Sequence, residues 1–245
     1  MHITPGWRPL KTAALLTGVI CLVACTDTTT NPDPYEATNR QIHEFNKGVD
    51  RAVIRPTSNA YAAVVPKPAR RGVSNVVHNL REPLNFINHA LQGDVEDAGQ
   101  TFFRFAMNTV FGFGGLLDPA SDAGLFENET DFGETMAVWG VPSGAYQEIP
   151  FYGPSTERDT FGVVVDVVMN PLTHVLDGDP AIAYRTGQVA DLLNERNEYG
   201  RVIDTLLYES ADSYLAARIA YFQNRALEVN DEVATDDLED PFAFE

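Results

Sequence analysis

Two segments of this chain read as helices whose apolar residues cover most of the surface and leave one narrow polar stripe. In 95–111 the polar residues recur at i, i+4, i+7 and i+11, and in 158–170 they recur at strict i+4 spacing. The stripes are Asp97, Thr101, Arg104 and Asn108 in the first segment and Arg158, Gly162, Asp166 and Asn170 in the second. A surface helix of a globular protein has the opposite proportions, so these segments restrict the fold strongly.

Two interpretations fit such helices. Either they are central helices buried in a core, with the stripe reaching water, or hydrocarbon surrounds their apolar sides and the stripes face an aqueous interior. Neither segment has the roughly 20 apolar residues that a membrane-crossing helix needs. Helices that lie within one leaflet satisfy both constraints.

The body of the chain is predicted to be mainly α, because helical spacing recurs from residue 35 onward and no run shows strict alternation. A first helix, with apolar residues spaced over 42–53, should end before Arg55-Pro56, since the residue before a proline disfavours the α region. Pro83 should kink or divide the helix over 70–91. A further helical region spans 181–227.

Two helix starts carry capping residues. Asp94 is a suitable N-cap for 95–111, and Thr156 with Asp159 fits a capping box for the second apolar helix. Between the helices lie Gly/Pro-rich loops, chiefly 112–130 and 140–154, which are longer than the usual connections in helical bundles. Long loops of this kind are often functional.

The N-terminus has the pattern of a secretion signal. Arg8 and Lys11 precede an apolar run, 12–24, which is too short to cross a bilayer but has the length of a signal-peptide core. The run ends in small residues directly before Cys25, as in the lipobox at which bacterial lipoprotein precursors are acylated and cut. We expect residues 1–24 to be removed and Cys25 to carry lipid. An ordinary signal peptide followed by a chance cysteine is the alternative.

The residues after the cysteine favour delivery to the outer membrane. An Asp directly after the lipidated cysteine tends to retain such proteins at the inner membrane, whereas here Thr26 stands there and Asp27 follows. The stretch 25–34 is then a lipidated N-terminus and short linker, reaching at most roughly 30 Å. We expect a helical domain over 35–227 and an acidic, disordered tail over 228–245.

Charge and cysteine content exclude several classes of function. The formal charge of −18 argues against nucleic-acid binding, which needs a basic surface. The only cysteines are Cys21 and Cys25, so a disulfide framework or a thiolate metal site is excluded from the folded body. Residues 40–81 nevertheless hold eight basic residues against two acidic ones. This segment is either a solvated helix face or a surface for phosphate or an acidic partner.

Catalytic and metal-binding motifs are incomplete. The sequence His43-Glu44-Phe45-Asn46-Lys47 begins like a zinc-protease motif but has Lys47 where the second histidine must stand. The carboxylates of 94–99 lack the spacing of a calcium loop. Gly112-Phe113-Gly114-Gly115 is better explained as a hinge or close-packed turn than as a phosphate-binding loop. We therefore predict no enzyme activity, no cofactor and no metal site.

Motifs along the first two thirds of the chain resemble the MlaA (VacJ) family of outer-membrane phospholipid-transport lipoproteins. The matching stretches are Asp33-Pro34-Tyr35-Glu36-Ala37-Thr38-Asn39-Arg40, Val65-Pro66-Lys67-Pro68-Ala69-Arg70, Asn79-Leu80-Arg81-Glu82-Pro83, Leu91-Gln92-Gly93-Asp94, Arg104-Phe105-Ala106-Met107-Asn108-Thr109, Gly112-Phe113-Gly114-Gly115-Leu116-Leu117-Asp118, Phe132-Gly133-Glu134-Thr135 and Pro150-Phe151-Tyr152-Gly153-Pro154. Together they reach to about Asp159, with weaker similarity to Gln223.

The resemblance implies a single ring-like helical domain lying in the inner leaflet of the outer membrane, often beside trimeric porins. A passive channel through the ring would let mislocalised phospholipid leave the outer leaflet and pass to a soluble periplasmic carrier, which maintains lipid asymmetry. The family has no catalytic residues. A structural envelope lipoprotein that scaffolds outer-membrane proteins without moving lipid is the alternative.

The polar stripes supply the candidate residues of such a conduit. We expect headgroups to cross along Arg104, Asn108, Asp166 and Asn170 while acyl tails remain against apolar walls. Mobile glycines are the candidates for a gate, although an inert surface turn explains them equally well. These are Gly112, Gly114 and Gly115 in the first long loop and Gly140 and Gly144 in the second.

Overall fold

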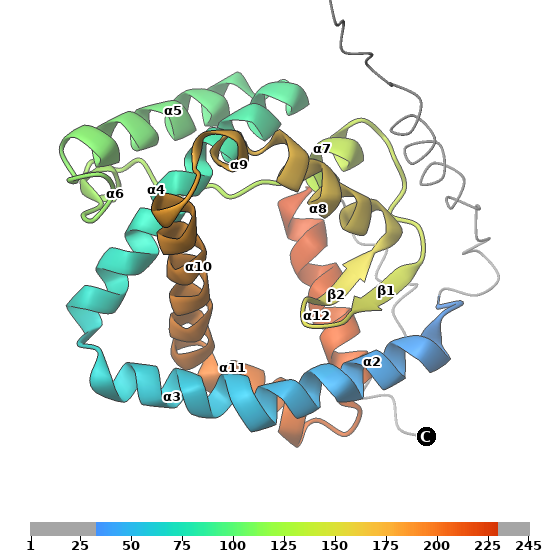
Figure 1. Ribbon diagram of the computed structural model, residues 1–245. Helices are drawn as coiled ribbons and strands as arrows, with labels where there is room; N and C mark the ends of the chain where they lie inside the picture. The colour runs from blue at the N-terminus through green and yellow to red at the C-terminus, as the bar shows by residue number, and fades with distance from the viewer. Residues whose placement is uncertain (1–32, 230–245) are drawn as a thin grey trace, which may run out of the picture.

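The computed structural model describes residues 33–229 as a ring of helices closed on one side by a small β-hairpin (Figure 1). The expected signal peptide, Cys25, most of the linker and nearly all of the tail lie outside the described residues. The helices are α2 Glu36–Val49, α3 Arg55–Val64, α4 Lys67–Gln92, α5 Val95–Val110, α6 Pro119–Asp122, α7 Phe132–Val138, α8 Glu157–Met169, α9 Pro171–Val175, α10 Asp179–Glu198, α11 Gly200–Asp204 and α12 Ser213–Glu228, with π-helical segments η1 Asp50–Ile54 and η2 Thr205–Glu209. The prediction of a mainly α, ring-like domain is confirmed.

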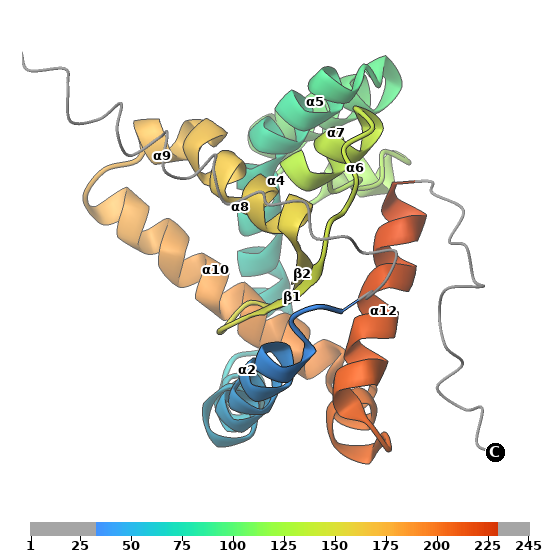
Figure 2. The ribbon, with the colours of Figure 1, turned by 90° about the vertical axis from the view of Figure 1, so that its right-hand side faces the viewer.

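The ring follows the order of the chain (Figure 1). In that view α2 and α3 form one side, α4 the next, α5 the third, and α7, α8 and the hairpin the fourth. Helix α10 packs on α3 and α4. Figure 2 shows α10 running diagonally from α9 toward the lower end of α12. No helix among residues 33–229 is both long enough and apolar enough to cross a membrane.

The first helical run does not end before Arg55-Pro56, so that prediction is wrong. Helix α2 continues through η1 into α3, and Arg55 keeps helical dihedral angles, with φ −57° and ψ −52°. In a regular α-helix the pyrrolidine ring of Pro56 would clash with a backbone carbonyl of the preceding turn. The π-helical turn adds one residue just before the proline and so makes room for it. Pro83 likewise lies inside α4 without dividing it.

The loop over 140–154 contains an antiparallel hairpin that the alternation pattern did not predict. Strand β1, Tyr146–Ile149, pairs with β2, Gly153–Thr156, with Tyr146 opposite Thr156 and Ile149 opposite Gly153. A strand is normally recognised in a sequence by apolar residues on its buried face and polar residues on the other. In β1 the charged residue Glu148 lies on the buried face together with Tyr146, so this alternation is absent.

Both predicted N-caps are confirmed. Asp94 accepts a hydrogen bond from the backbone N–H of Asp97 at 3.0 Å, and Thr156 accepts one from the N–H of Asp159 at 3.2 Å. The predicted capping box is only half formed, because the Asp159 carboxylate accepts from the hydroxyl of Thr156, at 2.8 Å, and not from its backbone N–H. These caps fix where α5 and α8 begin, and therefore which residues of each helix face the ring.

Candidate functional site

Helix α5 buries its polar stripe and exposes its apolar residues. Thr101, Arg104 and Asn108 are buried, whereas Phe102 is 55% exposed and Phe103 is 61% exposed. Helix α8 follows the same rule, with Gly162 buried and Val164 exposed. Of the two interpretations of these helices, burial in an apolar core is wrong. Among the described residues, buried polar side chains outnumber buried apolar ones.

Arg104 and Asn108 hold the segment after α5 against that helix. Arg104 forms a buried ion pair with Glu82 of α4 at 2.8 Å and donates hydrogen bonds to Ser121 and to the carbonyl oxygen of Leu125. Asn108 donates to Asp118 at 2.8 Å and accepts from the N–H of Ala120 at 3.1 Å. Neither residue lines the cavities described below.

Asp166 and Asn170 face open space inside the ring. The Asp166 carboxylate accepts hydrogen bonds from the Asn88 side chain and from the N–H of Phe132, both at 3.0 Å. Burial raises the pKa of Asp166. Asn170 caps α9 by accepting from the N–H of Leu172 at 2.9 Å, and both residues line two adjoining cavities.

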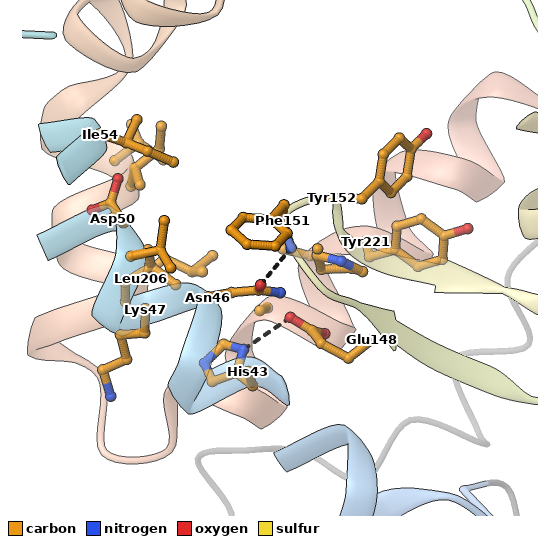
Figure 3. A pocket seen from close by; sticks show the side chains of 18 residues that line it. His43, Asn46, Lys47, Asp50, Ile54, Glu148, Phe151, Tyr152, Leu206 and Tyr221 are labelled. Atoms are coloured by element: carbon orange, nitrogen blue, oxygen red, sulfur yellow. Dashed lines mark hydrogen bonds and ion pairs between the residues drawn. The ribbon is translucent and has the colours of Figure 1, made fainter. Parts of the chain in front are cut away.

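The first cavity is apolar and lies between α2, the hairpin and the α11–α12 region (Figure 3). Its volume is about 410 Å³. Ile54, Leu206 and Phe151 contribute apolar side chains, while Asn46 and Glu148 supply polar groups at one edge. Its chemistry suits a hydrocarbon chain better than a charged group.

Three further cavities continue from the first toward the α5 side of the ring. Their volumes are about 420, 270 and 380 Å³. Tyr152 lines both the first and second cavities, Asp166 lines the second and third, and Glu134 lines the third and fourth. Because neighbouring cavities share lining residues, the four adjoin one another in a series that begins apolar and becomes charged, and we call this series the internal path.

Carboxylates dominate the charged end of this path. The third cavity is lined by Arg81 and Arg225 against Glu129, Asp131, Glu134, Asp166 and Glu228. Arg225 is already paired with Asp131 at 2.7 Å and with Asp159 at 3.0 Å. Burial, together with the charge of Asp131, raises the pKa of Glu134 to about 7. The path therefore carries an excess of negative charge at this end.

Polar residues of α2 hold the hairpin that borders the first cavity. Asn39 donates to the carbonyl oxygen of Tyr146 at 3.1 Å and accepts from the N–H of Glu148 at 3.0 Å. Asn46 donates to the carbonyl oxygen of Ile149 at 3.0 Å and accepts from the N–H of Phe151 at 2.7 Å. Helical spacing alone did not predict this role for α2. The signal was present as Asn39, His43, Asn46 and Asp50 at i, i+4, i+7 and i+11.

The candidate gate glycines divide into packed and open positions. A Cβ at Gly112 would lie 2.5 Å from the carbonyl oxygen of Asn108, and one at Gly115, with φ +91°, would lie 2.6 Å from the Cβ of Asn79. A Cβ at Gly144 would lie 2.5 Å from Glu157, whereas Gly114 and Gly140 face open space. Gly112 and Gly115 thus form a close-packed turn, and whether any of the five acts as a gate stays a prediction.

The exposed apolar side chains suit hydrocarbon, and the buried polar side chains and cavities suit polar groups. These features define a class of protein that lies in a membrane and encloses a polar interior. The model of the MlaA lipoprotein family matches residues 31–228. The chain belongs to the MlaA lipoprotein family.

Curated relatives cover nearly the whole chain. The intermembrane phospholipid transport system lipoprotein MlaA of Haemophilus influenzae is 34% identical over 235 residues, which are 91% of this chain and 92% of that protein. The protein of the same name from Escherichia coli K12 is 37% identical over 225 residues, 87% of this chain and 86% of its own. A solved structure described as the structural basis for maintenance of bacterial outer membrane lipid asymmetry matches with a TM-score of 0.69 and 33% identity, covering 81% of this chain and 99% of that one.

Proposed function

We propose that this protein is an outer-membrane lipoprotein that forms a passive phospholipid channel, removes mislocalised phospholipid from the outer leaflet and passes it to a soluble periplasmic carrier. The observation that carries the proposal is the chain of adjoining cavities, which begins among apolar side chains near Phe151 and ends among carboxylates near Glu134. An amphipathic path matches a molecule with apolar tails and a polar headgroup.

The exposed apolar side chains support a position within one leaflet. They cover the outside of α5, the turn that follows it, and α8, where a folded protein in water would leave few large apolar groups together. They include Phe102, Phe103, Val110, Phe111, Phe113, Leu116, Leu117, Phe161, Val164 and Val168. Acyl chains on Cys25 would hold this surface at the bilayer, because the predicted linker is short.

The proposed partners follow from this position. A protein set in the inner leaflet of the outer membrane needs a neighbour that reaches the outer leaflet, and trimeric porins are the partners that the family resemblance implies. A soluble carrier is needed on the periplasmic side, because phospholipid does not cross water freely.

Replacing Asp166 and Asn170 by Leu tests the path. Both residues line the second and third cavities, so two apolar side chains there would remove polar groups that a headgroup contacts. We expect transfer of a fluorescent phospholipid from the outer leaflet of reconstituted vesicles to an acceptor to fall about tenfold, the cost of one or two lost polar contacts.

The matched control is Asp122→Leu with Asn59→Leu, which makes the same chemical change at two exposed positions outside the cavities. Its transfer rate should equal that of the wild type. If the wild type neither co-purifies with phospholipid nor transfers it, the result favours the alternative function, a structural lipoprotein that scaffolds outer-membrane proteins without moving lipid. If Asp166→Leu/Asn170→Leu folds, inserts and transfers normally, the assignment of these residues is wrong.

A further inference from the structure

A cluster of a histidine and carboxylates joins α4 to α10. His78 lies on α4, Asp191 and Glu195 lie on α10, and Glu127 lies in the segment between α6 and α7. Helices α4 and α10 pack together along the ring (Figure 1). The ligand-type atoms of His78, Asp191 and Glu195 all lie within 4.8 Å of one another. His78, Asp191 and Glu195 do not line the internal path.

The Asp191 carboxylate is buried without a hydrogen bond. Asp191 is 1% exposed, and neither of its carboxylate oxygens makes a hydrogen bond of ordinary length and angle within the described residues, although His78 and Ser74 lie near enough to lower its pKa. Nε2 of His78 lies 3.3 Å from Oδ2, within the range of an ion pair, and this nitrogen also lacks a hydrogen bond within residues 33–229. A buried carboxylate left in this state is costly unless an ion or a charged group satisfies it.

The geometry resembles the first and second shells of a metal site. Two ligand atoms, each 2.0–2.1 Å from a tetrahedral ion, lie about 3.3 Å apart, which is the separation of His78 Nε2 and Asp191 Oδ2. The other ring nitrogen, Nδ1, lies 2.9 Å from Oε2 of Glu127, and a metal-bound histidine commonly donates its second N–H to such a carboxylate. Asp191 and Glu195 stand four residues apart on α10, so they share one face of it.

We propose that His78, Asp191 and Glu195 bind one divalent transition-metal ion, with Zn²⁺ as the reference ion, and that this ion ties α10 to α4. Nitrogen and carboxylate ligands together favour Zn²⁺ over Mg²⁺ or Ca²⁺, which prefer oxygen alone. The three ligands come from two helices about 110 residues apart in sequence, so no short sequence motif predicts the site.

The competing state is a protonated His78 that bridges two carboxylates. Without an ion, Asp191 and Glu127 raise the pKa of His78 to about 10, so that the ring itself carries the positive charge. The two states differ in a measurable way. A metal displaces the proton from Nε2, and binding then releases about one proton per ion.

Calorimetric titration of the metal-free full-length protein in mild detergent with ZnCl₂ at pH 7.5 distinguishes them. We expect one saturable site per chain, an enthalpy that varies with the buffer's ionisation enthalpy by about one proton, and an upward shift of the melting temperature with Zn²⁺ but not with Mg²⁺. His78→Gln should weaken binding at least 100-fold. His174→Gln, at an exposed histidine on α9, is the matched control and should bind as the wild type does.

Glu195→Gln keeps the proposal testable if His78→Gln fails to fold, since it leaves the His78–Asp191 pair in place. It should weaken Zn²⁺ binding about tenfold or more, as loss of one ligand does. Absence of a saturable site in the wild type, or Zn²⁺ binding of equal strength in the wild type, His78→Gln and Glu195→Gln, would overturn the proposal and leave the bridging imidazolium.

Discussion

Gly162 lies where α8 passes closest to α7, and its missing side chain permits the contact. A Cβ there would lie 2.5 Å from the backbone nitrogen of Gly133 and 2.8 Å from its Cα, closer than packed atoms approach. We predict that Gly162→Ala destabilises the protein by about 1–3 kcal/mol, the usual cost of overpacking. Thermal unfolding in detergent measures it.

Gly99 provides the control because it also lies inside a helix but has open space around a built Cβ. Gly99→Ala should be neutral or should stabilise by up to about 1 kcal/mol through helix propensity. Equal melting temperatures for the two variants would show that the α7–α8 contact tolerates a methyl group.

Glu134 makes stability depend on pH. It is 6% exposed, and burial raises its pKa from 4.5 to about 7. The folded state binds the Glu134 proton more tightly than the unfolded state does. The resulting contribution to the free energy of unfolding is therefore fully present below pH 4.5 and is lost as the pH rises through 7; it amounts to about 3 kcal/mol at most. Glu134 faces Asp131, Arg225, Glu228 and the hydroxyl of Thr130.

We therefore predict that Glu134→Gln becomes more stable relative to the wild type as the pH rises from 4.5 to 8. The glutamine oxygen can still accept the hydrogen bond that the N–H of Asp131 donates to Glu134. The measurement is the difference in melting temperature between Glu134→Gln and the wild type at each pH. The control Glu96→Gln, at an exposed residue of α5, should show no pH-dependent difference from the wild type. A pH-independent gap for Glu134→Gln contradicts the prediction.

At the scale of elements, an ion-pair network holds the π-helical turn η1 against the C-terminal helices. Arg196 of α10 forms two hydrogen bonds with Asp50 at 2.7 and 2.8 Å and a third with Asp204 at 2.7 Å. Tyr208 donates to Asp50 at 2.7 Å, and Arg55 reaches Asp204 at 2.6 Å. Both members of the Asp50–Arg196 pair are buried, so each needs the other.

Arg196→Met should therefore destabilise the protein by about 3–5 kcal/mol, because it leaves the Asp50 carboxylate buried without its main partner. Adding Asp50→Asn should recover a large part of this loss, since the uncompensated charge is then removed. Unfolding of the two single variants and the double variant gives the coupling between the residues. Additive losses would mean that the pair does not act as a unit.

At the scale of the whole molecule, the acidic end of the internal path predicts a preference among lipids. The third cavity has more carboxylates than arginines, and the fourth is lined by Asp94, Asp97, Glu129, Glu134 and Glu228, with no lysine or arginine from residues 33–229. If this path carries phospholipid, phosphatidylethanolamine should transfer about tenfold faster than phosphatidylglycerol at low salt, and the difference should shrink as salt is added.

Matched fluorescent lipids that differ only in the headgroup measure this preference in the reconstituted transfer assay. Glu129→Gln with Glu228→Gln removes two carboxylates that line both the third and the fourth cavity. This double variant should lower the ratio of the phosphatidylethanolamine transfer rate to the phosphatidylglycerol transfer rate. Faster transfer of the anionic lipid by the wild type would show that the carboxylates do not control passage.

The sequence alone determined the mainly helical character of the body, two of the helix caps and the family. Helical periodicity, the N-caps Asp94 and Thr156, and the reversed polarity of α5 depend on residues a few positions apart, and backbone hydrogen bonds of a helix are equally local. The stripes therefore identified the polar face of α5 correctly, but they left open whether this face reaches outer water or turns inward, and whether protein or lipid surrounds the other faces.

Tertiary structure alone decided the rest. Continuation of the helix through Pro56, the hairpin bound to Asn39, the separate positions of Arg104 and Asp166, and the meeting of His78 with Asp191 all depend on contacts between distant segments. Asn39 and Tyr146, for example, are 107 residues apart. Local patterns do not encode such pairs, because each forms only when the closed ring satisfies polar groups that the separate helices leave unpaired.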